Sequence, residues 1–165
     1  MYDVNHMADL FGKPQRDPLW WTSRVGSSHV GSSKVVRKDW GKEHWLVDES
    51  APWGFKVLYL RAGKRTSLQY HEQKEEACLV LMGEGLIHYA ESSGHRTRVD
   101  RIVAGDVVHI KPGGVHRFEG VTDTILVEVS NPQLDDVIRL EDDWSRANGR
   151  IDAEHSEEEG LIERQ

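Results

Sequence analysis

Two short stretches of this 165-residue chain carry side chains whose types and spacing can hold a metal ion. In the first stretch, Gln69 and His71 would point to one face of a β-strand, and a return strand that begins at Glu76 could place its carboxylate beside His71. In the second stretch, His116 follows a Gly-rich turn and shares a face with Phe118. Imidazole nitrogen, carboxylate oxygen and amide oxygen are donors that a divalent first-row metal accepts. A single histidine of this kind is more often an ordinary polar residue at a strand end, so the prediction depends on the whole set.

The elements that would position these residues are short apolar segments separated by Gly-containing turns. Strand length and β-branched or aromatic content mark residues 56–60, 77–82, 86–89, 106–110 and 124–129. Strands this short and frequent, without long helical periodicity, predict an all-β barrel or sandwich, with helix only near the chain ends.

The spacing of the two stretches resembles the two sequence motifs of the cupin superfamily. The first motif is matched at every interval, with a Gln at the position of its first His, by Gly63, Gln69, His71, Glu76 and Gly83. The second motif fits Gly105, Lys111, Gly113 and His116, where Lys111 replaces the usual Pro. The resemblance implies a double-stranded β-helix, which is a small antiparallel jelly-roll barrel with the metal inside it.

Three further stretches are similar to the cupin domain of type II mannose-6-phosphate isomerases. They are residues 38–45, residues 67–71 and residues 137–146. The resemblance implies one divalent metal ion (Zn, Mn, Fe, Co or Ni) with Gln69, His71, Glu76 and His116 as its ligands. It also implies Arg146 as a substrate-contacting or catalytic residue, although Trp144 and Ser145 replace the Tyr-Gly pair expected before it. Such enzymes interconvert aldose and ketose phosphates by metal-assisted proton transfer.

Several cations near the two motifs are candidates for contact with an anionic sugar. We expect Lys64, Arg65 and Arg117 to bind substrate, because the planar fork of arginine suits phosphate. Lys111 could act as a general base or as an anion contact. A solvated strand edge is the alternative for Lys64 and Arg65, and an ordinary surface position is the alternative for Lys111.

The net charge of −7, from 21 basic and 28 acidic residues, does not oppose an anionic substrate. Acidic and basic side chains cancel over residues 1–134, and the acidic excess lies after that point. Nucleic acid is not expected as a partner, because phosphate backbones need a basic face. The longest apolar run, residues 77–82, is too short to cross a bilayer, so we expect a cytoplasmic protein without membrane contact. The single cysteine excludes an internal disulfide.

Composition divides the chain into three regions. Residues 1–34 form an aromatic arm with a Gly/Ser-rich connector, residues 35–146 form the expected cupin domain, and residues 147–165 form an acidic tail expected to be disordered. By resemblance to other cupins, we expect a homodimer that uses the arm.

Three functions remain open from the sequence. The first is a metal-dependent isomerase acting on a phosphorylated or nucleotide-linked sugar. The second is a non-catalytic sugar-binding or regulatory cupin. The third is a mononuclear Fe(II) dioxygenase, because His71, Glu76 and His116 also make a two-histidine, one-carboxylate set.

Overall fold

Successive side chains along a β-strand point to opposite faces, and in some strands of this protein burial alternates accordingly. In β7 (Glu76–Met82), Cys78 and Val80 are buried, whereas Leu79 and Leu81 between them are exposed. This pattern gives each strand one face toward the interior. The computed structural model describes residues 23–25, 28–30, 34–47, 50–133, 135–146 and 148–151.

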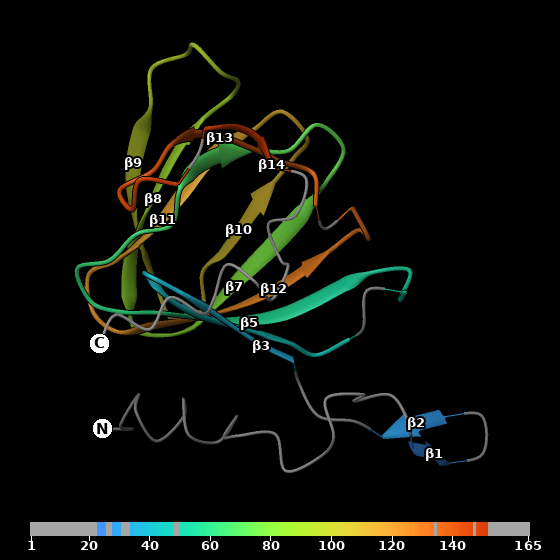
Figure 1. Ribbon diagram of the computed structural model, residues 1–165. Coiled ribbons are helices and arrows are strands. Elements are labelled where there is room, and N and C mark those ends of the chain that lie inside the picture. Colours follow the sequence, from blue (N-terminus) through green and yellow to red (C-terminus); the bar gives the residue numbers. More distant parts are fainter. Residues whose placement is uncertain are drawn as a thin grey trace.

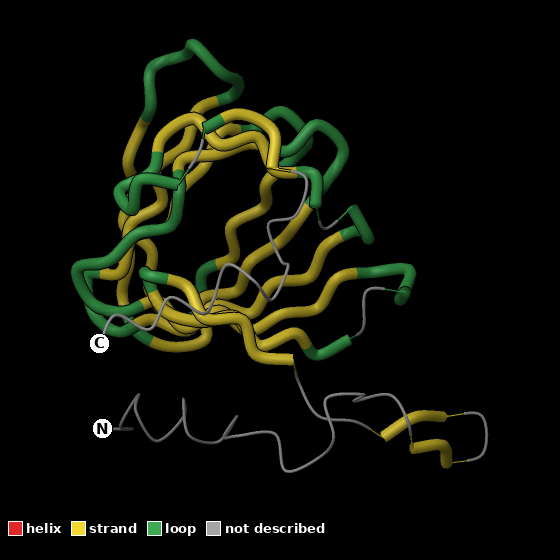
Figure 2. The backbone as a smooth tube through the Cα atoms, in the orientation of Figure 1, coloured by secondary structure: helices red, strands yellow, loops and turns green. Residues whose placement is uncertain are grey.

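Two six-stranded antiparallel sheets face each other as the walls of a barrel (Figures 1 and 2). The first sheet has the order β10 (Val107–Ile110), β7, β12 (Thr124–Ser130), β5 (Gly54–Leu60), β4 (Gly41–Trp45), β3 (Lys34–Lys38). The second has the order β14 (Gly149–Ile151), β13 (Val137–Glu141), β6 (Leu68–Tyr70), β11 (Val115–Gly120), β8 (Glu84–Ala90), β9 (Arg98–Val103). A separate pair consists of β1 (Ser23–Val25) and β2 (Ser28–Val30).

From β5 to β13 the chain passes back and forth between the two sheets, apart from the β8–β9 hairpin, and this is the connectivity of a double-stranded β-helix. Gly83 makes the short crossing from β7 to β8. Its φ of 86° favours glycine, and a Cβ there would lie 2.3 Å from the carbonyl oxygen of Asp123. The described residues contain no helix, so the predicted jelly-roll class with little helix is confirmed.

The interior divides into an apolar region and a polar one. The apolar core joins both sheets through Leu58, Leu60, Val80 and Leu126 of the first and Ile87, Ile102 and Phe118 of the second. Several buried charged side chains, among them Lys74 and Glu128, lie toward the other part of the barrel interior, around His71 and Glu76. This polar region is where the two predicted motifs meet.

The five strands predicted from apolar content are confirmed as parts of β5, β7, β8, β10 and β12. The second sheet continues past the expected domain boundary at residue 146, because β14 pairs with β13. Residues 1–22 and 152–165 lie outside the described part, so the division into arm, cupin domain and tail stays a prediction. No helix in the described part is long and apolar enough to span a membrane.

Candidate metal centre

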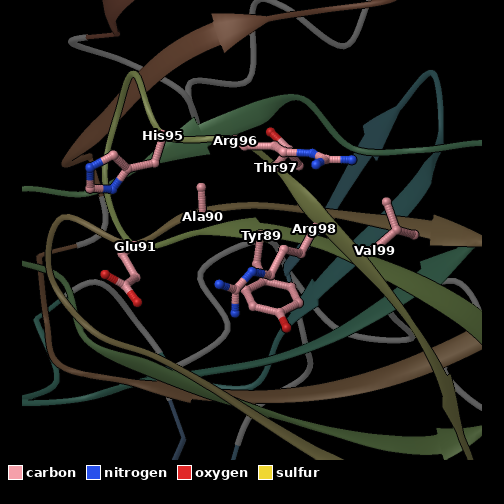
Figure 3. A pocket seen from close by; sticks show the side chains of 8 residues that line it. All are labelled: Tyr89, Ala90, Glu91, His95, Arg96, Thr97, Arg98 and Val99. Atoms are coloured by element: carbon pink, nitrogen blue, oxygen red, sulfur yellow. The ribbon is translucent and has the colours of Figure 1, made fainter.

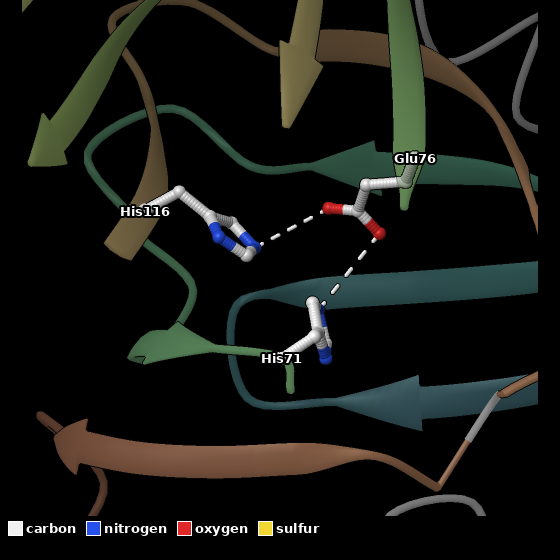
Figure 4. Close-up of side chains that lie close together, drawn as sticks. All are labelled: His71, Glu76 and His116. Atoms are coloured by element: carbon white, nitrogen blue, oxygen red, sulfur yellow. Dashed lines mark ion pairs between the residues drawn. The ribbon is translucent and has the colours of Figure 1, made fainter. Parts of the chain in front are cut away.

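His71, Glu76 and His116 come together inside the barrel (Figure 4). Glu76 begins β7 of the first sheet, His116 lies on β11 of the second, and His71 follows β6 directly. One potential ligand atom from each residue lies within 4.8 Å of the other two. The backbone N–H of Gly113 donates to the carbonyl of His71 at 2.7 Å, so the turn before His116 is tied to the end of β6. The two predicted motifs therefore form one site.

Both histidines are held with one particular ring nitrogen facing Glu76. Nδ1 of His71 is hydrogen-bonded to the carbonyl of Asp136, and Nδ1 of His116 lies 3.1 Å from the carbonyl of Gly114. A carbonyl can only accept, so each Nδ1 carries a hydrogen, and in the neutral imidazole Nε2 then carries the lone pair. Nε2 of His71 lies 3.9 Å, and Nε2 of His116 lies 3.3 Å, from the two carboxylate oxygens of Glu76. Backbone carbonyls that orient ligand histidines in this way are a regular feature of metal sites.

The charge states of these residues suit a cation. Burial, with the nearby charges of Lys74 and His116, lowers the pKa of His71 to about 4, which keeps its imidazole neutral. Burial alone would raise the pKa of Glu76, but the Lys74 ammonium and His116 hold it well below its ordinary value. The centre therefore offers the neutral imidazole of His71 and the carboxylate of Glu76, with the imidazole of His116 beside them.

This donor set fits a divalent first-row metal ion. Among the described residues, Nε2 of His71 is buried without any hydrogen-bond partner, and an unpaired buried polar atom is costly unless something binds it. Gln69 is the direct cross-strand neighbour of His116 and lines the same cavity, and its Oε1 accepts a hydrogen bond from the Ser67 hydroxyl at 2.7 Å. Its place beside the centre suits the predicted fourth ligand, and that assignment stays a prediction.

Four charged side chains that the sequence patterns left unassigned also line this cavity, which measures about 50 Å³: Glu43, Lys56, Lys74 and Glu128. All four are buried. Nζ of Lys56 lies 3.5 Å from the carboxylate of Glu43 and 4.2 Å from the centre of a Trp45 ring. Alternation along the strand could have indicated that Lys56 is buried, because it shares a face with Leu58 and Leu60.

A second, larger pocket of about 920 Å³ opens beside the metal centre and shares His116 with it. The pocket lies between the edge strands β9 and β10 and the inner strand β8, and it is lined by residues from all three. Lys111 lines it as well and is exposed. Of the cations predicted to act near the site, Lys111 is the one that shares a pocket with a metal-centre residue.

The other predicted cations are occupied elsewhere. The buried guanidinium of Arg117 donates to the Thr66 carbonyl at 2.7 Å and to Glu141 at 3.0 Å, on the face of β11 opposite His116. Strand alternation could have shown this, because His116 and Phe118 share the inner face.

The remaining three form contacts at the surface or near it. Arg65 is bonded to the carboxylate of Asp143, and Nζ of Lys64 lies 4.6 Å from the centre of a Trp144 ring. Arg146 donates to Asp142 at 2.7 Å. None of these residues lines either pocket. Their predicted roles in substrate binding or catalysis gain no support from the geometry.

Comparison with known proteins points to one family. The family model described as "Mannose-6-phosphate isomerase C-terminal" matches residues 26–142. No curated protein matches the chain. The capsular polysaccharide assembling protein CapF from Staphylococcus aureus matches with a TM-score of 0.57 at 20% identity, over 72% of this chain and 37% of that one.

A variant of oxalate decarboxylase from B. subtilis matches with a TM-score of 0.56 at 14% identity, over 66% of this chain and 30% of that one. The chain thus spans well under half the length of these two structures. At such identities the likeness shows a shared fold and nothing about activity.

Proposed function

The chain belongs to the family of mannose-6-phosphate isomerase C-terminal domains, and from that premise we propose that it is a metal-dependent isomerase of a sugar phosphate. The single observation that carries the proposal is the pair of Nε2 atoms held toward Glu76 by carbonyl bonds to Nδ1. His71, Glu76, His116 and Gln69 would hold one divalent ion. Nitrogen and oxygen donors of this kind accept several first-row metals, so Zn, Mn, Fe, Co and Ni all remain compatible.

The proposed reaction is the interconversion of an aldose phosphate and its ketose. A divalent ion at this centre would polarise the substrate carbonyl and acidify the adjacent C–H. Lys74 keeps Glu76 ionised, and the two carbonyl bonds keep the imidazoles oriented. We assign to Lys111 the role of stabilising negative charge on the substrate, because its side chain lines the large pocket together with His116.

The chemistry of isomerisation also narrows the substrate. A sugar must open to a free carbonyl at C1 or C2 before a proton can move between these carbons. A nucleotide-linked sugar has C1 locked in the linkage to phosphate and cannot open. We therefore propose a phosphate monoester carried away from C1. The large pocket, at about 920 Å³, lies within the size range of small-molecule sites.

NMR of the metal-loaded protein with mannose 6-phosphate and fructose 6-phosphate in deuterated water tests this function. Interconversion with deuterium uptake at C1 or C2 is the expected result, and it should disappear in His116→Ala. Absence of both conversion and exchange would overturn the proposed reaction. Saturable binding of the sugar phosphate without conversion would instead favour a non-catalytic sugar-binding cupin.

A second candidate is a mononuclear iron oxygenase. It is favoured by one observation: the three residues that converge are two histidines and one carboxylate, the set that non-haem Fe(II) oxygenases use. Oxygen consumption by the Fe(II)-loaded protein across a panel of candidate substrates separates the two functions. An isomerase would consume no oxygen under these conditions.

A further inference from the structure

Three residues on neighbouring strands form a row that leads away from the metal centre. In the register of the second sheet, His116 of β11 is paired with Tyr89 of β8, and Tyr89 is paired with Arg98 of β9. Directly paired residues of antiparallel strands point to the same face of a sheet. Arg98 and Tyr89 therefore belong to the face on which His116 meets the metal centre. His116 and Arg98 are two strand spacings apart, so their backbones are separated by about 10 Å.

A pocket lies at the far end of this row. It measures about 650 Å³, and its lining includes Tyr89, Arg98 and the residues of the β8–β9 connection (Figure 3). It shares Tyr89, Ala90 and Glu91 with the large pocket that His116 lines. In Figure 3 the side chains of Tyr89 and Arg98 lie next to each other, whereas Arg96 extends in another direction. The lining of the two pockets thus continues from His116 past Tyr89 to Arg98.

The two side chains beyond His116 have chemistry that suits a sugar phosphate. The hydroxyl of Tyr89 donates to Asp100 at 2.8 Å, which fixes the ring, and an aromatic ring presents an apolar surface on which a sugar can pack. Arg98 is exposed and its side chain forms no ion pair or hydrogen bond within the described part of the chain. Arg101 of the same strand differs, because its guanidinium lies 2.6 Å from the carboxylate of Glu84. The guanidinium of Arg98 is therefore available to an anion.

We propose that Arg98 binds the phosphate of the substrate, with Tyr89 packing against the sugar between Arg98 and the metal centre. This assignment rests on the proposed function, which identifies the substrate as a sugar phosphate. It adds a specificity-determining residue that no sequence motif marked. It explains how a reacting carbonyl and a distant phosphate can be held at once. The fork of Arg98 matches phosphate oxygens with two charged hydrogen bonds.

Calorimetric titration of the metal-loaded full chain with mannose 6-phosphate, with mannose and with pyrophosphate tests the assignment. The variants are Arg98→Gln, Arg98→Lys and the matched control Arg37→Gln, since Arg37 is exposed on β3 of the other sheet and lines neither pocket. Arg98→Gln should weaken binding of mannose 6-phosphate at least about tenfold, since a charge-assisted hydrogen bond is worth roughly 1.5–3 kcal/mol. Metal content and mannose binding should not change. Arg98→Lys should recover part of the loss, and Arg37→Gln should match the wild type.

The outcomes separate this assignment from the proposed function. Isomerisation that persists with equal substrate affinity in Arg98→Gln would overturn the Arg98 site and leave the isomerase intact. Arg98-dependent binding of pyrophosphate or mannose 6-phosphate without any isomerisation would support the site and refute the isomerase. Absence of phosphate binding to the wild-type protein would overturn the Arg98 site outright.

Discussion

The ammonium group of Lys74 lies 2.8 Å from a carboxylate oxygen of Glu128, a residue 54 positions away in the chain. Both side chains are buried, and the same ammonium contacts Glu76, the carboxylate of the metal centre. Isolated buried charges cost several kcal/mol each, so these three groups are stable only as a set. The electrostatics of the metal centre is therefore determined by β12 as well as by the two motifs.

Replacing Lys74 with methionine should destabilise the metal-free protein by roughly 3–5 kcal/mol, because two buried carboxylates would lose their shared cation. Urea unfolding followed by tryptophan fluorescence measures this change. The double variant Lys74→Met/Glu128→Gln should recover part of the lost stability, since it leaves one carboxylate in place of two. If Lys74→Met lowered the free energy of unfolding by less than about 1 kcal/mol, the ion pairs of Lys74 with Glu76 and Glu128 would contribute little to stability.

Removing a metal-centre side chain should abolish metal binding. Elemental analysis of freshly purified protein should find one divalent ion per chain, and His71→Ala, Glu76→Ala and His116→Ala should each weaken affinity by more than about 100-fold. This exceeds the 10–100-fold cost of losing a residue that only orients a ligand. His109→Ala is the control, because His109 is exposed and bonded to Glu75. If the wild-type protein contained no metal and none of the three substitutions changed its stability, the assignment of these residues as metal ligands would be wrong.

Asp136 should influence the metal without touching it. Its carbonyl accepts from Nδ1 of His71, and its carboxylate accepts from the backbone N–H of Lys74 at 3.0 Å. Asp136→Ala should free this loop and weaken metal affinity about tenfold while the stoichiometry stays at one. Competition with a chromophoric chelator measures the affinity. Asp39→Ala, which removes an exposed carboxylate on another loop, should have no effect; an equal loss there would indicate a general charge effect.

The nearness of His71 and Glu76 could be predicted from local spacing, whereas the addition of His116 was implied by the resemblance to the two cupin motifs. Gln69 and His71 are two positions apart in the chain, Glu76 begins the return strand, and His116 follows the Gly113 turn. These distances along the chain fix where each side chain lies once the barrel forms. The buried triad could not be found in this way, because Lys74 lies in a polar turn and its partner Glu128 comes from a distant strand.

The position of Arg117 shows that nearness in sequence is not nearness in space. Arg117 follows His116 directly, and for that reason its side chain lies on the other face of β11. Arg98, which the register of the second sheet places in a row with His116, lies in a polar segment without motif spacing. Cross-strand register relates these residues, and register is not visible in single-strand patterns.

Acid should destabilise the metal-free protein through His71. Its pKa is about 4 in the folded protein and ordinarily about 6.5, so as the pH falls below about 6.5 the unfolded chain takes up a proton that the native state excludes. The contribution of His71 to the free energy of unfolding is complete above pH 6.5, and it has fallen by about 3 kcal/mol at pH 4. Buried His44, also with a pKa of about 4, adds a loss in the same direction. Urea unfolding of the metal-free protein between pH 4 and 7.5 should show this slope, and His71→Gln should reduce it while the contribution of His44 remains. An unchanged slope in His71→Gln would refute the assignment of the depressed pKa to His71.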